Sequence, residues 1–381
     1  MAVTDVRVAF DAAPVAPKTA GAITQKNFSI QSVRGVAALF VVLFHASFYS
    51  GRYFGESVWA TVFDGRFALI GVAAFFTVSG LLMADLIQRT DPWRFLAHRM
   101  VRIYPPYLLA VAVLLVLIAT HLTIGGLSFH LLSLMLVPAG YRPYYLGVEW
   151  TLVFECAYYV GLFLIALLSW RDHLNRIALF WLLLIAAASF IWSNDGNNLY
   201  VYSIWLSAAN VAFIGGLLIP LLRKTHIPIG AGVLALCIFL IVTLPANLVI
   251  DRWIAGAVAT LFLLDVMRVQ IPRRALLGLP NLGDWSYALY LCHVPCILLV
   301  YQWWPSSTSV GTAWIIAVAM ALVVAAAFGT LDVWMYKHFK SAVDHSDEQD
   351  RRRVVNIYAG VFTIASLIAL VFVARPFGAT P

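Results

Sequence analysis

The chain has 381 residues, of which 62% are hydrophobic and only 11% are charged, and its mean hydropathy is +0.88. A soluble domain is about half apolar and about a quarter charged, so this composition excludes water as the main solvent of the chain. The formal net charge is +7, but the basic residues lie in short clusters between apolar runs, a pattern that reflects membrane topology and predicts no nucleic-acid partner.

The first 26 residues contain Pro14, Pro17 and two aspartates, without the basic start and short apolar core of a secretory signal. We therefore predict a flexible cytosolic tail at residues 1–27. A membrane domain is expected at 28–340. Residues 341–381 would add a charged cytosolic loop and one further transmembrane helix.

Eleven apolar segments are long enough to cross the hydrocarbon core of a bilayer. They lie at residues 30–50, 66–88, 103–120, 148–169, 177–193, 199–222, 228–246, 251–267, 283–303, 311–336 and 355–374. The run at 127–139 is too short to cross. The expected fold is an all-α polytopic membrane protein with about 11 transmembrane helices and one short re-entrant or interfacial helix.

The distribution of basic residues supports this topology independently. With a cytosolic N-terminus, 20 of the 25 lysines and arginines lie on cytosolic loops and span ends, and 5 lie outside. Counting 127–139 as a span would move most of the downstream basic clusters outside, against the positive-inside rule. We expect an integral protein of the plasma membrane, which is the bacterial inner membrane, in contact with its lipid. The C-terminus is expected outside.

The first span carries two ionisable residues, Arg34 and His45, which lie eleven positions apart. On a helix this separation is roughly 16 Å, so a cation near the cytosolic end precedes an imidazole deep in the membrane. Arg34 could simply anchor the span, and His45 could join two helices by a hydrogen bond. Charged groups inside a bilayer cost about 2.5–3.5 kcal/mol each, which favours a functional role for the pair.

Arg99 and Arg102 precede the third span and are three residues apart, on one helical face beside the membrane. Guanidinium groups at this spacing can bind phosphates through paired hydrogen bonds. For each arginine taken alone, a topology anchor is the better explanation.

The fourth span begins with Glu149 and Trp150 at its outer edge, and Glu155 follows one to two turns further in. Trp150 is typical of an interfacial anchor. Glu155 needs a partner, because a lone carboxylate in hydrocarbon would take up a proton or destabilise the helix. A catalytic or substrate-binding role for Glu155 competes with a structural ion pair.

In the ninth span, Ser286, Tyr290 and His293 share a helical face. A similar polar stripe would suit a transporter. Cys292 and Cys296 flank His293, but no further ligands of suitable spacing occur, so we predict no metal site.

These residues fall into five motifs that together resemble the acyltransferase-3 family of membrane acyltransferases. That family includes enzymes that acetylate O-antigen, exopolysaccharide and Nod factor. The matching positions are Arg34 and His45; Phe75, Phe76, Ser79 and Gly80; Arg99 and Arg102; Trp150, Thr151, Leu152, Glu155 and Tyr159; and Gly283, Ser286, Tyr287, Tyr290 and His293. The resemblance runs from about residue 28 to 340.

Two positions depart from the family pattern. Thr151 stands where a serine is usual, and Asp332 lacks the proline that follows the acidic residue in many members. From the sequence, Asp332 is expected to pair with Lys337 or with a basic loop.

The resemblance implies an enzyme that moves an acyl group, expected to be acetyl, from cytosolic acyl-CoA to a hydroxyl of an envelope or exported carbohydrate. Acyl-CoA would be a co-substrate, with no permanently bound cofactor. Arg34, Arg99 and Arg102 would bind the donor phosphates, and His45 would act as the catalytic base.

We hypothesise that neutral His45 takes the proton of the acceptor hydroxyl, with an acyl-histidine intermediate as the variant mechanism. Glu155 would orient His45 or bind the acceptor. Tyr290 and His293 would bind the acceptor or stabilise the oxyanion, and Ser286 and Trp150 are further candidates for that site. The rival from another class is a secondary transporter in which Arg34, His45 and Glu155 bind a solute or relay protons, although no internal repeat is evident.

Overall fold

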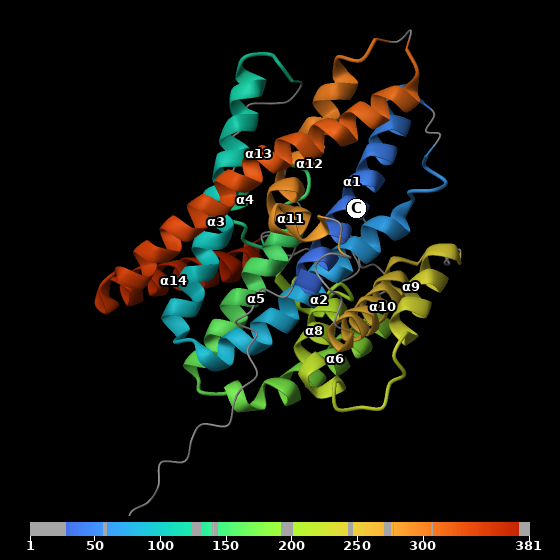
Figure 1. Ribbon diagram of the computed structural model, residues 1–381. Coiled ribbons are helices and arrows are strands. Elements are labelled where there is room, and N and C mark those ends of the chain that lie inside the picture. Colours follow the sequence, from blue (N-terminus) through green and yellow to red (C-terminus); the bar gives the residue numbers. More distant parts are fainter. Residues whose placement is uncertain are drawn as a thin grey trace, which may run out of the picture.

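The computed structural model is helical throughout the part of the chain that it describes, with no strand there (Figure 1). The described residues are 28–55, 59–123, 131–138, 140, 144–191, 201–242, 247–269, 276, 278–305 and 308–372. The predicted N-terminal tail at 1–27 therefore lies outside them. The helices are α1 (Phe28–Phe54), α2 (Gly65–Arg89), α3 (Pro92–Ala119), α4 (Leu131–Leu134), α5 (Trp150–Leu167), η1 (Arg171–His173), α6 (Leu174–Ile191), α7 (Val201–Leu206), α8 (Asn210–Leu222), α9 (Ala231–Ile241), α10 (Leu248–Arg268), α11 (Leu279–Asp284), α12 (Ser286–Gln302), α13 (Val310–His345) and α14 (Glu348–Phe372).

Every apolar segment predicted from the sequence overlaps one of these helices, which confirms the all-α class. Within the described residues, seven helices are long and apolar enough to cross a membrane, and the shorter α8, α9 and α12 are also apolar. Helices suit a chain in lipid because they satisfy their backbone hydrogen bonds internally. The chain is thus built as an integral membrane protein, while the count of eleven crossings and the sides of the termini stay predictions.

Several helices differ from the predicted boundaries. Helix α13 runs on to His345 and α14 begins at Glu348, so most of the predicted charged loop after residue 340 is helical. Helix α3 begins at Pro92, eleven residues before the predicted start of its span, because the Asp91 side chain accepts a hydrogen bond from the Arg94 amide at 3.0 Å and caps the helix. Hydropathy alone does not place residues 92–102 in the span, because this segment contains three arginines. The predicted span 199–222 is interrupted between α7 and α8. At the predicted short helix, α4 covers only Leu131–Leu134, and residues 124–130 lie outside the described part.

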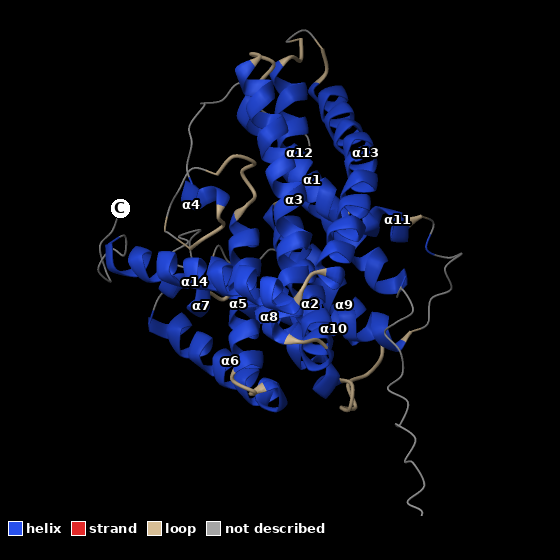
Figure 2. Cartoon of the chain, turned by 90° about the vertical axis from the view of Figure 1, so that its left-hand side faces the viewer, coloured by secondary structure: helices blue, strands red, loops and turns tan. Residues whose placement is uncertain are grey.

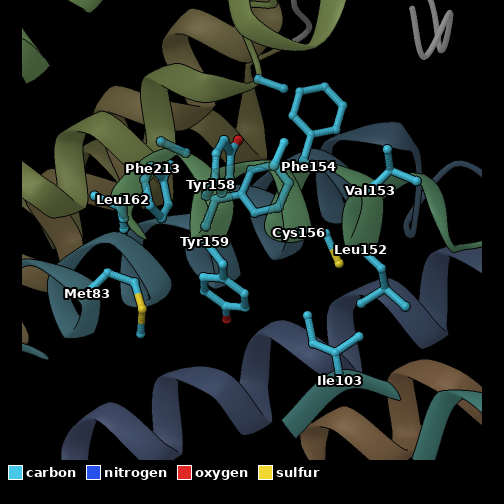
Figure 3. Packing of buried hydrophobic residues seen from close by; sticks show 14 of the residues in the cluster. Met83, Ile103, Leu152, Val153, Phe154, Cys156, Tyr158, Tyr159, Leu162 and Phe213 are labelled. Carbon is cyan, nitrogen blue, oxygen red and sulfur yellow. The ribbon is translucent and has the colours of Figure 1, made fainter. Parts of the chain in front are cut away.

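Helix α5 lies in the middle of the main hydrophobic core, and most of its side chains are buried. Figure 3 shows Phe154 and Tyr158 packed on one side of it, where Tyr158 stacks on Phe213 of α8 with 3.9 Å between the ring centroids. Tyr159 projects from another side of the helix, towards Met83 and Ile103. Residues on this second side of α5 face the candidate site.

Helices α2 and α8 cross with almost no space between their backbones. A Cβ atom on Gly216 would lie 2.1 Å from the Thr77 carbonyl oxygen, and one on Gly80 would lie 2.1 Å from the Phe213 carbonyl oxygen. Glycine at both positions allows this approach, as small residues do in membrane helix pairs. Gly80 therefore serves packing, whereas Phe75, Phe76 and Ser79 of the same sequence motif line a cavity.

We expect Gly216→Ala to lower the stability of the protein by about 1–3 kcal/mol, because the added methyl group forces the two backbones apart. The thermal unfolding midpoint of the purified protein in detergent measures this. Gly360→Ala on α14 is the matched control, since a Cβ there meets nothing within 4 Å. An equal drop in both variants would contradict the role assigned to the α2–α8 crossing.

Helix α14 crosses the other helices at a steep angle, as Figure 2 shows against α1 and α12. It packs against the first half of α3. The Tyr358 and Tyr104 hydroxyls lie 3.1 Å apart, and the Trp93 indole donates a hydrogen bond to Asn356 at 3.1 Å. These polar contacts attach α14 to the same helix that carries Arg99 and Arg102.

Candidate active site

One cavity, which we call the arginine cavity, lies between α1, α2, α3, α5 and α12 and has an empty volume of about 830 Å³. Its lining includes all three arginines that the sequence assigned to the donor, Arg34, Arg99 and Arg102. Glu155 is the one carboxylate among its lining residues in the described part of the chain. The excess of positive charge favours an anionic ligand.

Arg102 is held in place by a residue far away in the sequence. Its Nη1 atom donates to both carboxylate oxygens of Asp332 on α13, each at 3.0 Å, and the Asp332 side chain is fully buried. The guanidinium also lies over the rings of Tyr287 and Tyr336, 5.0 and 5.4 Å from their centroids. Of the two expected partners of Asp332, Lys337 is not the one observed; the partner is Arg102, from the basic segment that precedes the third predicted span.

Arg99 and Arg34 have weaker partners. Arg99 Nη2 donates to the Tyr336 hydroxyl at 3.4 Å, and its buried Nε atom has no hydrogen-bond partner among the described residues. Arg34 Nη1 donates to the Gln31 side chain at 3.5 Å. In the described part of the chain neither arginine forms an ion pair, so their hydrogen-bonding capacity is available to a ligand.

Glu155 accepts a short hydrogen bond from the Tyr159 hydroxyl, one helical turn further along α5. Both residues line the arginine cavity. The structure does not bring Glu155 to His45, which lines a different cavity. The contact that would let Glu155 orient His45 is therefore absent from the described residues.

The second cavity, which we call the histidine cavity, has an empty volume of about 1240 Å³ and lies beside the C-terminal half of α1 and the first turns of α2, α5 and α10. His45 lines it together with Trp150, Asp251 and Arg252. Val72, Phe76 and Tyr290 line both cavities, so the two meet at these three side chains. The arginine cavity and the histidine cavity thus share a wall within one membrane domain.

His45 is paired with the second histidine that the sequence singled out. His45 Nδ1 lies 3.0 Å from the Val41 carbonyl oxygen and 3.2 Å from His293 Nε2. His293 Nδ1 lies 3.0 and 2.8 Å from the carbonyl oxygens of Leu289 and Tyr290. Carbonyl oxygens only accept, so each Nδ1 carries the proton when the rings are neutral, and His293 Nε2 accepts from His45.

This arrangement determines which ring nitrogen of His45 can act as a base. With its proton on Nδ1, the unprotonated Nε2 atom is the basic nitrogen. Protonation at Nε2 would make Nδ1–H a stronger donor towards His293. His293 is therefore placed to orient His45 and to stabilise its charged form, much as a base is oriented in a catalytic triad.

Tyr290 belongs to the wall between the two cavities. Its hydroxyl donates to the Val148 carbonyl oxygen and lies 2.5 Å from the Thr151 hydroxyl. Because the single Tyr290 proton is directed to Val148, Thr151 is the donor in the second bond. The threonine that departs from the family pattern thus keeps the hydroxyl that a serine would supply.

Ser286 and His293, two sequence candidates for the acceptor site, line neither cavity, and neither does Glu149. The buried Ser286 hydroxyl donates to the Gly283 carbonyl oxygen at 2.7 Å. Glu149, expected at the outer edge of its span, is fully buried and accepts from the amides of Leu146 and Val148 at 2.6 and 3.0 Å. It fixes the turn that leads into α5.

Sequence reasoning missed Asp251 and Arg252 as site residues, because adjacent charges at the start of a span have the same pattern as an interfacial anchor. Only the packing of α10 against α2 and α8 places them in the cavity with His45.

Comparison with known proteins agrees with this geometry. A family model described as an acyltransferase domain matches residues 27–331, most of the chain, so this membrane protein belongs to the acyltransferase-3 family. The putative membrane-bound transacylase BcsY of Komagataeibacter xylinus is 27% identical over 71% of this chain and 72% of its own length. Nodulation protein 10 of Rhizobium leguminosarum bv. viciae is 28% identical over 78% of this chain and 92% of its own length. The exopolysaccharide production protein ExoZ of Rhizobium meliloti is 28% identical over 68% of this chain and 82% of its own length. No solved structure matches the chain.

Proposed function

We propose that the protein transfers an acyl group, with acetyl the expected one, from cytosolic acyl-CoA to a hydroxyl of a carbohydrate at the outer side of the membrane. The observation that carries this proposal is the meeting of the two cavities at Val72, Phe76 and Tyr290. Arg34, Arg99 and Arg102 provide cations for the CoA phosphates in one cavity. His45 provides a base in the other.

In the proposed reaction the acceptor hydroxyl oxygen attacks the thioester carbonyl carbon while His45 Nε2 takes the hydroxyl proton. The tetrahedral intermediate then collapses, the C–S bond breaks, and the leaving CoA thiolate receives the proton from the imidazolium. His293 stabilises the imidazolium by accepting from Nδ1–H at 3.2 Å. The thioester would lie at the wall between the cavities, within reach of both sides.

The relatives support a carbohydrate acceptor, since one of them is described as an exopolysaccharide production protein. Membership of an acyltransferase family favours this function over the transporter hypothesis. The donor, the acceptor, the O-ester product and a bacterial inner-membrane location are all parts of the proposal.

Inside-out membrane vesicles with and without the protein test it, because their cytosolic face is accessible to radiolabelled acetyl-CoA. We expect alkali-labile label in the glycan fraction only when the protein is present. A control lot receives no acetyl-CoA and is assayed for uptake of labelled sugars and amino acids. Solute uptake without any glycan labelling would overturn the proposal in favour of transport.

A further inference from the structure

The histidine cavity has two charged side chains at the first turn of α10, and neither is used by the proposed proton transfer. Its other walls are mostly apolar, with Phe44, Leu69 and Leu248 among them. Both residues lie at the start of α10 and line the same cavity as His45. Asp251 and Arg252 therefore call for a functional explanation.

The two residues are held differently. Arg252 is 8% exposed; its Nη1 atom donates to the Ser207 hydroxyl at 3.4 Å, and its guanidinium lies 5.7 Å from the centroid of the Trp150 ring. The Oδ1 atom of Asp251 is shielded from solvent and has no hydrogen-bond partner among the described residues. Asp251 as a whole is only partly buried, so a ligand in the cavity can approach its carboxylate, which is a strong acceptor for a hydroxyl.

The signs of the two charges restrict the ligand. A phosphate or carboxylate group would be attracted by Arg252 but repelled by the adjacent Asp251, and a cation would meet the reverse. A neutral hydroxyl both donates and accepts hydrogen bonds, so neighbouring hydroxyls on one ring can satisfy both side chains. Trp150 adds an aromatic ring, against which the CH groups of a sugar can pack.

We propose that Asp251, Arg252 and Trp150 form the acceptor-binding site and that it takes an uncharged, hydroxyl-rich sugar residue. This inference rests on the proposed function and deepens it. Asp251 accepts from one hydroxyl of the sugar, Arg252 donates to its neighbour, and a further hydroxyl is presented to His45. The site thus selects a neutral sugar unit, whatever the charge of the rest of the glycan.

The test uses the same inside-out vesicles with labelled acetyl-CoA and compares wild type with Asp251→Asn and Arg252→Gln. The first change keeps the side-chain size, and the second removes the charge but keeps an N–H donor on a shorter side chain. We expect acetyl transfer to glycan to fall at least about tenfold, as for the loss of a hydrogen bond to a charged group, with acetyl-CoA binding unchanged. Tandem mass spectrometry of the wild-type product should place the acetyl ester on a neutral sugar residue.

Arg52→Gln is the matched control, because Arg52 is an exposed cation at the end of α1 that does not line the cavity. Transfer by this variant should equal that of wild type. Normal transfer by both cavity variants, or an acetyl ester on a charged sugar residue, would overturn the acceptor site and leave the proposed function standing. A wild type that labels no glycan would overturn the proposed function itself.

Discussion

His45→Asn is expected to abolish most acyl transfer while leaving the protein folded and able to bind acetyl-CoA. The asparagine amide lies near the position of Nδ1, so it can still donate to the Val41 carbonyl oxygen or to His293 Nε2. It has no counterpart of the basic Nε2 atom. Loss of a general base lowers the rate by roughly 10²–10⁴. The measurement is acetyl transfer per mole of folded, donor-bound protein in vesicles.

Variants of the neighbouring histidine separate orientation from packing. His293→Phe removes the acceptor for His45 Nδ1–H, and we expect a smaller loss of turnover, about tenfold, since Val41 still holds the ring. His293→Gln can accept through its amide oxygen and should recover part of the rate. Near wild-type turnover by His45→Asn would disprove the catalytic assignment. Equal losses in both His293 variants would reduce His293 to a packing role.

Much of the fold could be predicted from the sequence, because hydrocarbon imposes long apolar helices on any chain that crosses it. Hydropathy does not predict a helix boundary that is set by polar side chains. Asp91 starts α3 eleven residues early, which places Arg99 and Arg102 on the helix itself. The interruption between α7 and α8 likewise has no signal in average hydropathy.

Most individual residues of the candidate site could be predicted from the sequence, but Asp251, Arg252 and the arrangement of the site in space could not. Single positions such as Arg34 and His45 stand out because a charged or titratable group in a span is costly. Which groups meet depends on helix packing. Asp332 reaches Arg102 across 230 positions of sequence, and His293 reaches His45 across 248. Neither pairing can be predicted from the local sequence pattern. The same is true of the separation of Glu155 from His45.

The donor side gives the second large effect. Arg99→Gln should weaken acetyl-CoA binding without unfolding the protein, because the Arg99 guanidinium has no ion-pair partner among the described residues. A charge-assisted contact to phosphate contributes about 1.5–3 kcal/mol, so the Kd should rise about tenfold or more. Titration calorimetry of the purified protein with acetyl-CoA measures this, and an unchanged Kd would remove Arg99 from the donor site.

Arg102 needs a different experiment, because it both faces the donor cavity and neutralises a buried carboxylate. Arg102→Met alone should destabilise the protein by about 3–5 kcal/mol, since Asp332 is fully buried and would be left unpaired. Replacing both partners, Arg102→Met with Asp332→Leu, removes the unpaired charge and should recover most of the unfolding midpoint. If Arg102 also binds phosphate, this stable double variant still binds acetyl-CoA at least about tenfold more weakly than wild type. A double variant with normal stability and normal donor affinity would limit Arg102 to joining α3 and α13, and would leave phosphate recognition to Arg34 and Arg99.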